Sequence, residues 1–410
     1  MIGLLTSMAL LVVAQSAAPD RIVGVRVHGN HTTPDAEVLQ IAQVEAGQLF
    51  TPSLPDEIQQ RLDRSGRFRR AEVRKRFASI SDPSAVLLVI LVEERAGISV
   101  DVPDPGPMRR LKAKTMWLPL LTREDGYGFT YGARVSFVDL LGARTRVSVP
   151  LTWGGERRAA VELERRFERG PISRLIGIAG ISRREHPSLD IADRRTGVMV
   201  RAERTLTPSL RIAGIGAIDD VRFGVEDERL ARAGVEAVLD TRQSPGFPRN
   251  AIFASATVER LAFQRSRDTM RLALDGRGFV GLFGQTVLAL RALHIRTADP
   301  VPVFEQSMLG GGATLRGFST GYRVGDRLAA GSAELRFPLS SPLKTARLGL
   351  AVFADSGTVY AAGDRLADAR WDTGAGAGVF VQAPILSMRL DIARGIGAGT
   401  RAHFTLGMTF

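Results

Sequence analysis

The sequence predicts a mainly β protein, in which a 16-stranded antiparallel transmembrane β-barrel follows one small α+β domain. From about residue 105 onward, segments of roughly 9 to 14 residues alternate apolar side chains with polar or small ones, and Gly, Pro or Asp turns separate them. Before them, residues 21–95 predict the order strand, helix, helix, strand, strand. No run of about 18 apolar residues follows the first thirteen positions, which excludes a helical membrane protein.

Residues 1–18 have the pattern of an export signal. Ile2 to Val13 form a short apolar core, and the small-residue stretch Ala14 to Ala18 follows it. We therefore expect a signal peptide over residues 1–18. A mis-assigned start or a buried strand is the alternative, because no Lys or Arg lies close to Met1.

The small domain is predicted over residues 21–95. Arg21–His28 alternates at period two, which favours a strand. A first helix is expected with Thr33 as its N-cap and Pro34 in its first turn, and a second from about Ser53. Two further strands are expected at Phe68–Phe77 and Ala85–Val92.

This element order resembles a POTRA domain, the periplasmic module of outer-membrane assembly and secretion proteins. The resemblance implies that the sheet edge at 68–77 binds extended polypeptides by β-augmentation. A generic α+β domain is the alternative. The matching residues are Gly29-Asn30, Gly47-x-x-Phe50, Leu62-x-x-x-Gly66-x-Phe68 and Val92-Glu93.

The barrel is predicted over residues 105–410. Alternation places apolar side chains toward lipid and polar ones toward the lumen, and closure leaves no unpaired sheet edge in lipid. A water-soluble β protein is the alternative, but it would need a packed core, whereas here the polar face is heavily charged. The even strand number puts both ends of the barrel on the periplasmic side. The expected strands span 110–120, 126–138, 143–153, 157–168, 172–184, 194–206, 209–220, 232–241, 250–263, 268–279, 285–297, 329–339, 346–356, 373–382, 386–395 and 401–410.

The net charge of +12 does not predict nucleic-acid binding. The arginines are spread along the chain and alternate with apolar residues, as in Arg389-Leu390-Asp391-Ile392. They form no compact basic run beside aromatic residues. This distribution favours a charged barrel lumen, and we expect no nucleic acid among the partners.

The longest non-strand stretch inside the barrel covers residues 298–328. A loop of this length is usually functional or disordered. It carries Arg316 close to three consecutive glycines. Period two places Asp355 and Glu334 on the lumenal faces of their strands. We expect Arg316 to pair with Asp355, with Glu334 nearby, and so to hold the loop inside the barrel. Ordinary solvated lumen charges are the alternative.

Several stretches, in order along the chain, resemble the BamA/TamA superfamily, also called the bacterial surface antigen family. The tip Arg316-Gly317-Phe318 resembles the family's hallmark on a loop that folds back into the lumen. The C-terminal Phe410 resembles its usual recognition residue for barrel assembly. The mid-barrel stretch of the family is matched by Asp240, Arg242, Pro245 and Pro248, and further similar stretches lie at 137–142, 331–338 and 353–357.

The resemblance implies an outer-membrane machine that inserts proteins into the membrane or moves polypeptides through it. The seam between its first and last strands is expected to open or to pair with client strands. Expected partners are the outer-membrane lipid bilayer, unfolded or extended polypeptide clients, and periplasmic or lipoprotein partners. Only one POTRA-like unit fits residues 21–95, whereas central insertases carry more. A passive outer-membrane pore or a structural surface antigen is the alternative.

No catalytic, metal-binding or cofactor-binding residues are predicted, and we expect no enzyme. The five histidines are scattered, with no pair at metal-ligand spacing, and Cys is absent. The run Gly310-Gly311-Gly312 lacks the Lys-Ser/Thr of a phosphate-binding loop.

Overall fold

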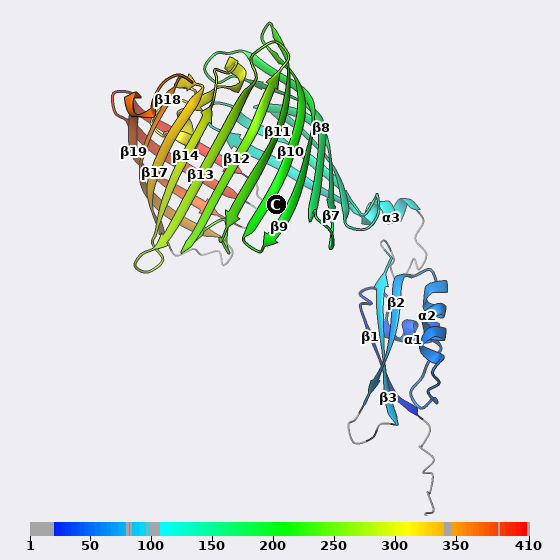
Figure 1. Ribbon diagram of the computed structural model, residues 1–410. Coiled ribbons are helices and arrows are strands. Elements are labelled where there is room, and N and C mark those ends of the chain that lie inside the picture. The colour runs from blue at the N-terminus through cyan, green and yellow to red at the C-terminus, as the bar shows by residue number, and fades with distance from the viewer. Residues whose placement is uncertain are drawn as a thin grey trace, which may run out of the picture. The chain divides into compact units, whose positions relative to one another are not determined.

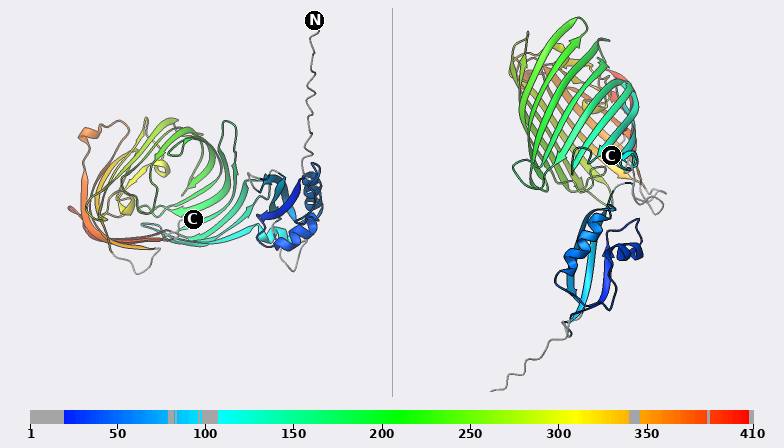
Figure 2. Two further views of the ribbon diagram at one scale, coloured as in Figure 1. Left: turned by 90° about the horizontal axis from the view of Figure 1, so that it is seen from below. Right: turned by 90° about the vertical axis from the view of Figure 1, so that its right-hand side faces the viewer.

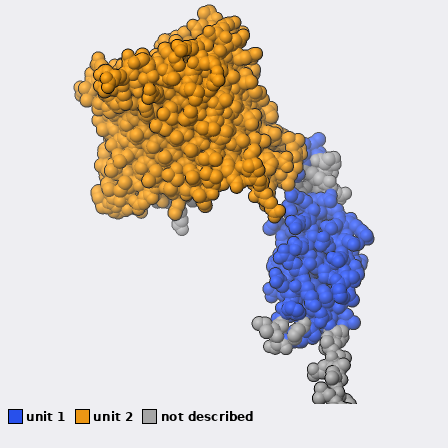
Figure 3. Space-filling model, viewed as in Figure 1, with its two compact units in different colours: residues 1–115 blue, residues 116–410 orange. Residues whose placement is uncertain are grey.

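The computed structural model (Figure 1) describes residues 20–78, 82, 84–95, 97, 107–339, 346–383 and 386–407. The expected signal peptide at 1–18 and the expected assembly signal Phe410 lie outside these residues. The chain divides into two compact units, residues 1–115 and 116–410 (Figure 3). No helix of the described chain is long and apolar enough to cross a membrane.

The first unit contains a sheet whose described strands lie in the order β1-β3-β2. β1 (Arg21–His28) runs parallel to β3 (Ala85–Glu94), while β2 (Phe68–Phe77) runs antiparallel to it. Between β1 and β2 the chain forms α1 (Asp35–Ala42) and α2 (Leu54–Arg64). This order confirms the predicted α+β domain. The central strand β3 is paired on both sides, whereas β2 lies at an edge of the sheet.

The core of this unit follows directly from sequence periodicity. On β3, every second side chain is buried, as at Val86, Leu88 and Ile90. On α2, Ile58 and Leu62 lie four residues apart on one face, and both are fully buried in the same core.

Thr33 does not cap α1 as the sequence predicted. Pro34 occupies the N-cap position, and no side chain caps the helix. Instead, the Glu94 carboxylate at the end of β3 accepts hydrogen bonds from the backbone N–H groups of Thr32 at 3.0 Å and Thr33 at 2.6 Å. The Glu94 carboxylate therefore holds the backbone just before the helix, outside its first turn.

Within the described residues, the second unit is a closed barrel of 16 antiparallel strands, as predicted (Figures 1 and 2). Each strand pairs with its neighbours along the chain, and β21 closes the ring on β4. The strands are β4 (Thr115–Glu124), β5 (Gly128–Val138), β6 (Thr145–Gly154), β7 (Glu156–Arg166), β8 (Arg174–Glu185), β9 (Ala192–Thr207), β10 (Leu210–Phe223), β11 (Glu226–Asp240), β12 (Ala251–Phe263), β13 (Thr269–Gly281), β14 (Val287–Thr297), β17 (Arg327–Pro338), β18 (Arg347–Tyr360), β19 (Asp372–Gln382), β20 (Ser387–Gly395) and β21 (Gly399–Gly407).

The two faces of the strands differ as predicted. On β18, the side chains of Phe353 and Asp355 are buried, while Leu350 and Val352 are 45% and 44% exposed on the opposite face. The exposed apolar face suits contact with lipid, and the polar face lines the lumen.

Two strand positions predicted from the sequence are wrong. The first strand was expected at 110–120, but α3 (Pro107–Ala113) occupies this stretch and β4 begins at Thr115. Pro at the first helical position and the helix formers that follow it explain the helix. The strand expected at 232–241 begins at Glu226, because its charged start pairs with β10, where Arg229 contacts Asp220.

The long loop between β14 and β17 covers residues 298–326 and has structure of its own. It contains a 3-10 turn (Val303–Glu305), β15 (Ser307–Leu309), α4 (Gly311–Thr314) and β16 (Arg323–Gly325), and β15 pairs with β16. Seen along the barrel, this yellow segment lies inside the ring of strands (Figure 2).

Candidate functional site

The tip of the loop is a tight turn that glycine makes possible. Gly310 and Gly317 have φ angles of 111° and 94°, a region that favours glycine. A Cβ on Gly317 would lie 2.5 Å from the backbone nitrogen of Gly395 on β20. The Gly311 N–H donates to the Phe318 carbonyl at 2.9 Å, which closes the turn. The loop backbone can therefore approach the barrel wall directly and present Arg316 to it.

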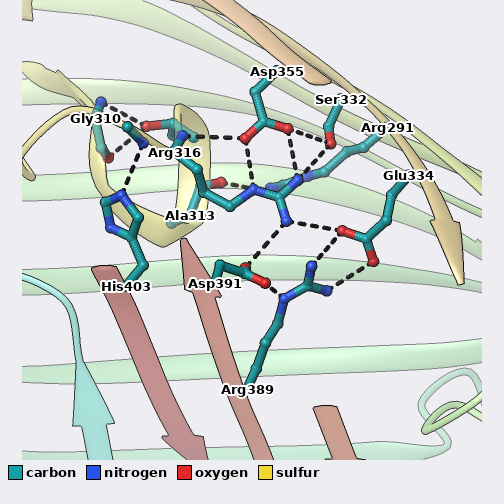
Figure 4. A network of polar contacts seen from close by, with 12 residues as sticks. Arg291, Gly310, Ala313, Arg316, Ser332, Glu334, Asp355, Arg389, Asp391 and His403 are labelled. Carbon is teal, nitrogen blue, oxygen red and sulfur yellow. Dashed lines mark hydrogen bonds and ion pairs between the residues drawn. The ribbon is translucent and has the colours of Figure 1, made fainter. Parts of the chain in front are cut away.

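Arg316 makes a two-pronged ion pair with Asp355 (Figure 4). Its Nε donates to Asp355 Oδ2 at 2.6 Å, and its Nη2 donates to Oδ1 at 2.7 Å. The backbone N–H of Arg316 also donates to Oδ2, at 3.1 Å. Both residues are buried, at 6% and 3% exposure. The structure thus brings together the two residues that the sequence suggested as partners.

The remaining N–H groups of the Arg316 guanidinium are also engaged. Nη1 donates to Glu334 at 2.8 Å and to Asp391 at 3.2 Å, and Nη2 donates to Ser332 at 3.2 Å. The guanidinium carbon lies 3.3 Å from the centre of the Phe353 ring. All five donors of the side chain therefore have acceptors on the barrel wall.

Two wall arginines balance the charge of these carboxylates. Arg389 donates to both oxygens of Glu334, at 2.8 and 2.6 Å, and to Asp391 at 2.6 Å. Arg336 donates to Glu334 at 2.7 Å. With Arg316 in place, three guanidinium groups face three buried carboxylates. Without it, the carboxylates would be left in excess.

Sequence reasoning missed five members of this site: Ser332, Arg336, Arg389, Asp391 and His403. Period two places each on the lumenal face of its strand, so their inward direction was visible in the pattern. The pattern could not show that these side chains meet a loop more than 15 residues away in the chain. His403 accepts a hydrogen bond from the Gly317 N–H at 2.8 Å.

The mid-barrel stretch lies beside the loop tip. Arg242 forms a two-pronged pair with Asp240 at 2.9 and 3.0 Å. Arg242, Pro245 and Pro248 line a lumenal cavity of about 270 Å³. Arg316 lines the same cavity, together with Glu334 and Asp355.

A second contact fixes the first part of the loop. Glu305 lies between Arg195 of β9 and Arg271 of β13, at 2.8 Å from a guanidinium nitrogen of each. Its side chain is 5% exposed. The loop therefore contributes groups of both signs to its ion pairs with the wall. It supplies a carboxylate here and a guanidinium at its tip. This contact was not predicted.

The part of the chain that the structure describes offers no group of three His, Asp or Glu side chains placed to hold a metal ion. The site consists instead of salt bridges and hydrogen bonds between an inserted loop and the lumenal wall. Such an arrangement can hold or release a loop.

Two family models match the chain. The Omp85 superfamily domain matches residues 224–410, and the POTRA model, described as the surface antigen variable number repeat, matches residues 21–95. No curated protein matches the sequence.

Solved structures share the fold at low sequence identity. BamA from Haemophilus ducreyi lacking POTRA domains 1-3 has a TM-score of 0.65 and 15% identity, over 95% of this chain and 84% of that chain. CdiB from Escherichia coli has a TM-score of 0.52 and 12% identity, over 99% and 93%. CdiB from Acinetobacter baumannii has a TM-score of 0.51 and 10% identity, over 96% and 74%.

Proposed function

This chain is an outer-membrane β-barrel protein with an Omp85 superfamily domain and one periplasmic POTRA domain, and we propose that it inserts polypeptides into the outer membrane or moves them across it. The observation that carries the proposal is the buried loop tip. Arg316 has acceptors for all five of its N–H groups on the wall. A loop fixed inside the lumen narrows the path that a passive pore would keep open.

The POTRA domain supplies a surface for extended polypeptides. β2 lies at the edge of its sheet, so one side of its backbone is available for pairing. A client segment would add to β2 as a further strand, with main-chain hydrogen bonds giving affinity. Exposed Arg70 and Arg76 on β2 favour acidic clients over basic ones.

Depletion of the protein in its own cell tests the proposal. Quantitative proteomics of the outer-membrane and secreted fractions should show selective loss of a few client proteins. Complementation with a chain that lacks residues 21–95 should leave the barrel in the membrane without restoring those clients. If neither fraction changes on depletion, the polypeptide function is wrong, and a passive pore or structural surface antigen becomes the better description.

A further inference from the structure

The seam of the barrel lies between β21 and β4. Within the described ranges, β21 and β4 share one register pair, Leu406 with Arg123, whereas nine register pairs join β20 to β21. Arg123 adds a side-chain contact, since its Nη1 donates to the Phe404 carbonyl at 2.6 Å.

His403 touches three parts of the molecule at this seam. It belongs to β21, its Nε2 accepts from the Gly317 N–H of the loop tip at 2.8 Å, and its Nδ1 lies 2.5 Å from Oδ2 of Asp125. Asp125 directly follows β4. Since a backbone N–H only donates, Nε2 is the acceptor and Nδ1 carries the proton that Asp125 accepts. The His403 side chain is 2% exposed, so water does not replace these bonds.

The loop also reaches the first strand by a second route. The Thr320 hydroxyl donates to the backbone carbonyl of Asp125 at 3.0 Å. A Cβ on Gly126 would lie 2.7 Å from the Thr320 Cβ, so the two segments are in close contact. The loop therefore binds both sides of the seam: β21 through His403, and the end of β4 through Thr320.

We propose that His403 is a positioning residue that couples the loop tip to the seam, so that β21 separates from β4 only when the tip leaves the wall. The inference rests on the proposed function, in which the seam opens toward clients. Coupling of this kind is reciprocal: displacing the loop favours an open seam, and opening the seam weakens the Arg316 contacts.

Distance measurements between two spin labels test the coupling in the full-length chain in detergent micelles. The chain has no cysteine, so Leu121→Cys on β4 and Ala402→Cys on β21 give the only labelled positions. Both side chains are exposed, and neither belongs to the His403 contacts. We expect a single distance population in the parent, and an added longer population in His403→Leu, which fills the space without hydrogen bonds.

Two comparisons separate coupling from general loosening. His403→Gln keeps one acceptor and one donor and should restore much of the parent population. His294→Leu is the control, because His294 lies on β14 and bonds to Tyr360, away from the seam. Arg316→Ala should open the seam as His403→Leu does, and the double variant should open it no further. If His403→Leu does not fold, Asp125→Ala removes the hydrogen bond between His403 and Asp125 from the other side.

An unchanged distance distribution in both His403→Leu and Asp125→Ala overturns the inference. So does a double variant in which the two effects simply add, because the loop and the seam would then act independently. Neither result depends on clients, so this inference can fail while the proposed function stands, and client loss can be absent while the coupling is measured.

Discussion

Arg316 is held by geometry as much as by charge. The planar guanidinium matches the two oxygens of Asp355 and still directs Nη1 toward Glu334 and Asp391. A lysine ammonium at this place has three donors on a flexible stem and cannot make the two-pronged pair. The stacking on Phe353 would be weakened as well.

Replacing Arg316 should therefore strongly destabilise the loop–wall contact. Arg316→Ala leaves buried carboxylates without their partner, which costs about 3–5 kcal/mol, and Arg316→Lys should recover only part of this. The temperature at which the purified barrel unfolds, read from its heat-dependent migration on gels, measures the effect. Arg229→Ala is the control, since its pair with Asp220 is exposed and screened by solvent. Equal shifts in both variants would contradict the buried cluster.

The carboxylate of Glu94 should make the stability of the POTRA domain depend on pH. Partial burial raises the pKa of Glu94, but hydrogen bonds from the Thr33 and Thr32 backbone outweigh burial and hold the pKa below its ordinary value. A lowered folded-state pKa stabilises the fold above the unfolded pKa of about 4.3, and this stability is lost as pH falls through the folded pKa. Residues 20–97 with Glu94→Gln should lose about 1–3 kcal/mol at neutral pH and little in acid, by chemical denaturation. If the difference in unfolding free energy between the parent and Glu94→Gln does not change with pH, the ionised Glu94 carboxylate is not the source of this stability.

At the scale of elements, glycines on two strands leave room for the loop tip at the barrel wall. A Cβ on Gly374 of β19 would overlap the carbonyl oxygen of Arg316, and one on Gly395 of β20 would lie 2.6 Å from the Phe318 ring. Gly374→Ala should push the tip off the wall and destabilise the barrel by about 1–3 kcal/mol. Gly278→Ala is the matched control, because a Cβ there meets nothing within 4 Å. Heat-dependent gel migration of the two variants compares them, and an equal effect would refute the close approach.

The first half of the loop has its own fixed point at Glu305. Glu305→Gln removes the loop carboxylate that Arg195 and Arg271 share, and leaves the two guanidinium groups with only their wall partners, Asp193 and Glu259. We expect faster hydrogen exchange across residues 298–309, measured by mass spectrometry, with less change at the Arg316 tip. Glu226→Gln, an exposed position at the start of β11, should leave exchange in the loop unchanged. Uniformly faster exchange over the whole loop would show that the two contacts are not separate.

The sequence predicted the strands of the barrel more completely than the contacts of the site. Alternation at period two gave the barrel, its strand number and the inward direction of Asp355 and Glu334, because that pattern is local. It misplaced the first strand, where Pro107–Ala113 forms a helix. It also missed Asp391 and His403, because their contacts join strands far apart in the chain to one loop. Only the closed barrel brings these strands around the tip, and no local pattern encodes that meeting.

At the scale of the whole molecule, we expect the inserted loop to limit conduction through the barrel. Contacts at Glu305, Arg316 and Thr320 hold it against β9, β13, the wall at β17–β20 and the end of β4. A channel closed in this way should pass small, flickering currents in planar lipid bilayers. Deletion of residues 308–320 removes the tip and should give larger and steadier openings, while Arg229→Ala should conduct like the parent. Large, steady openings in the parent itself would instead favour a passive pore, since the loop would then hold no barrier in the lumen.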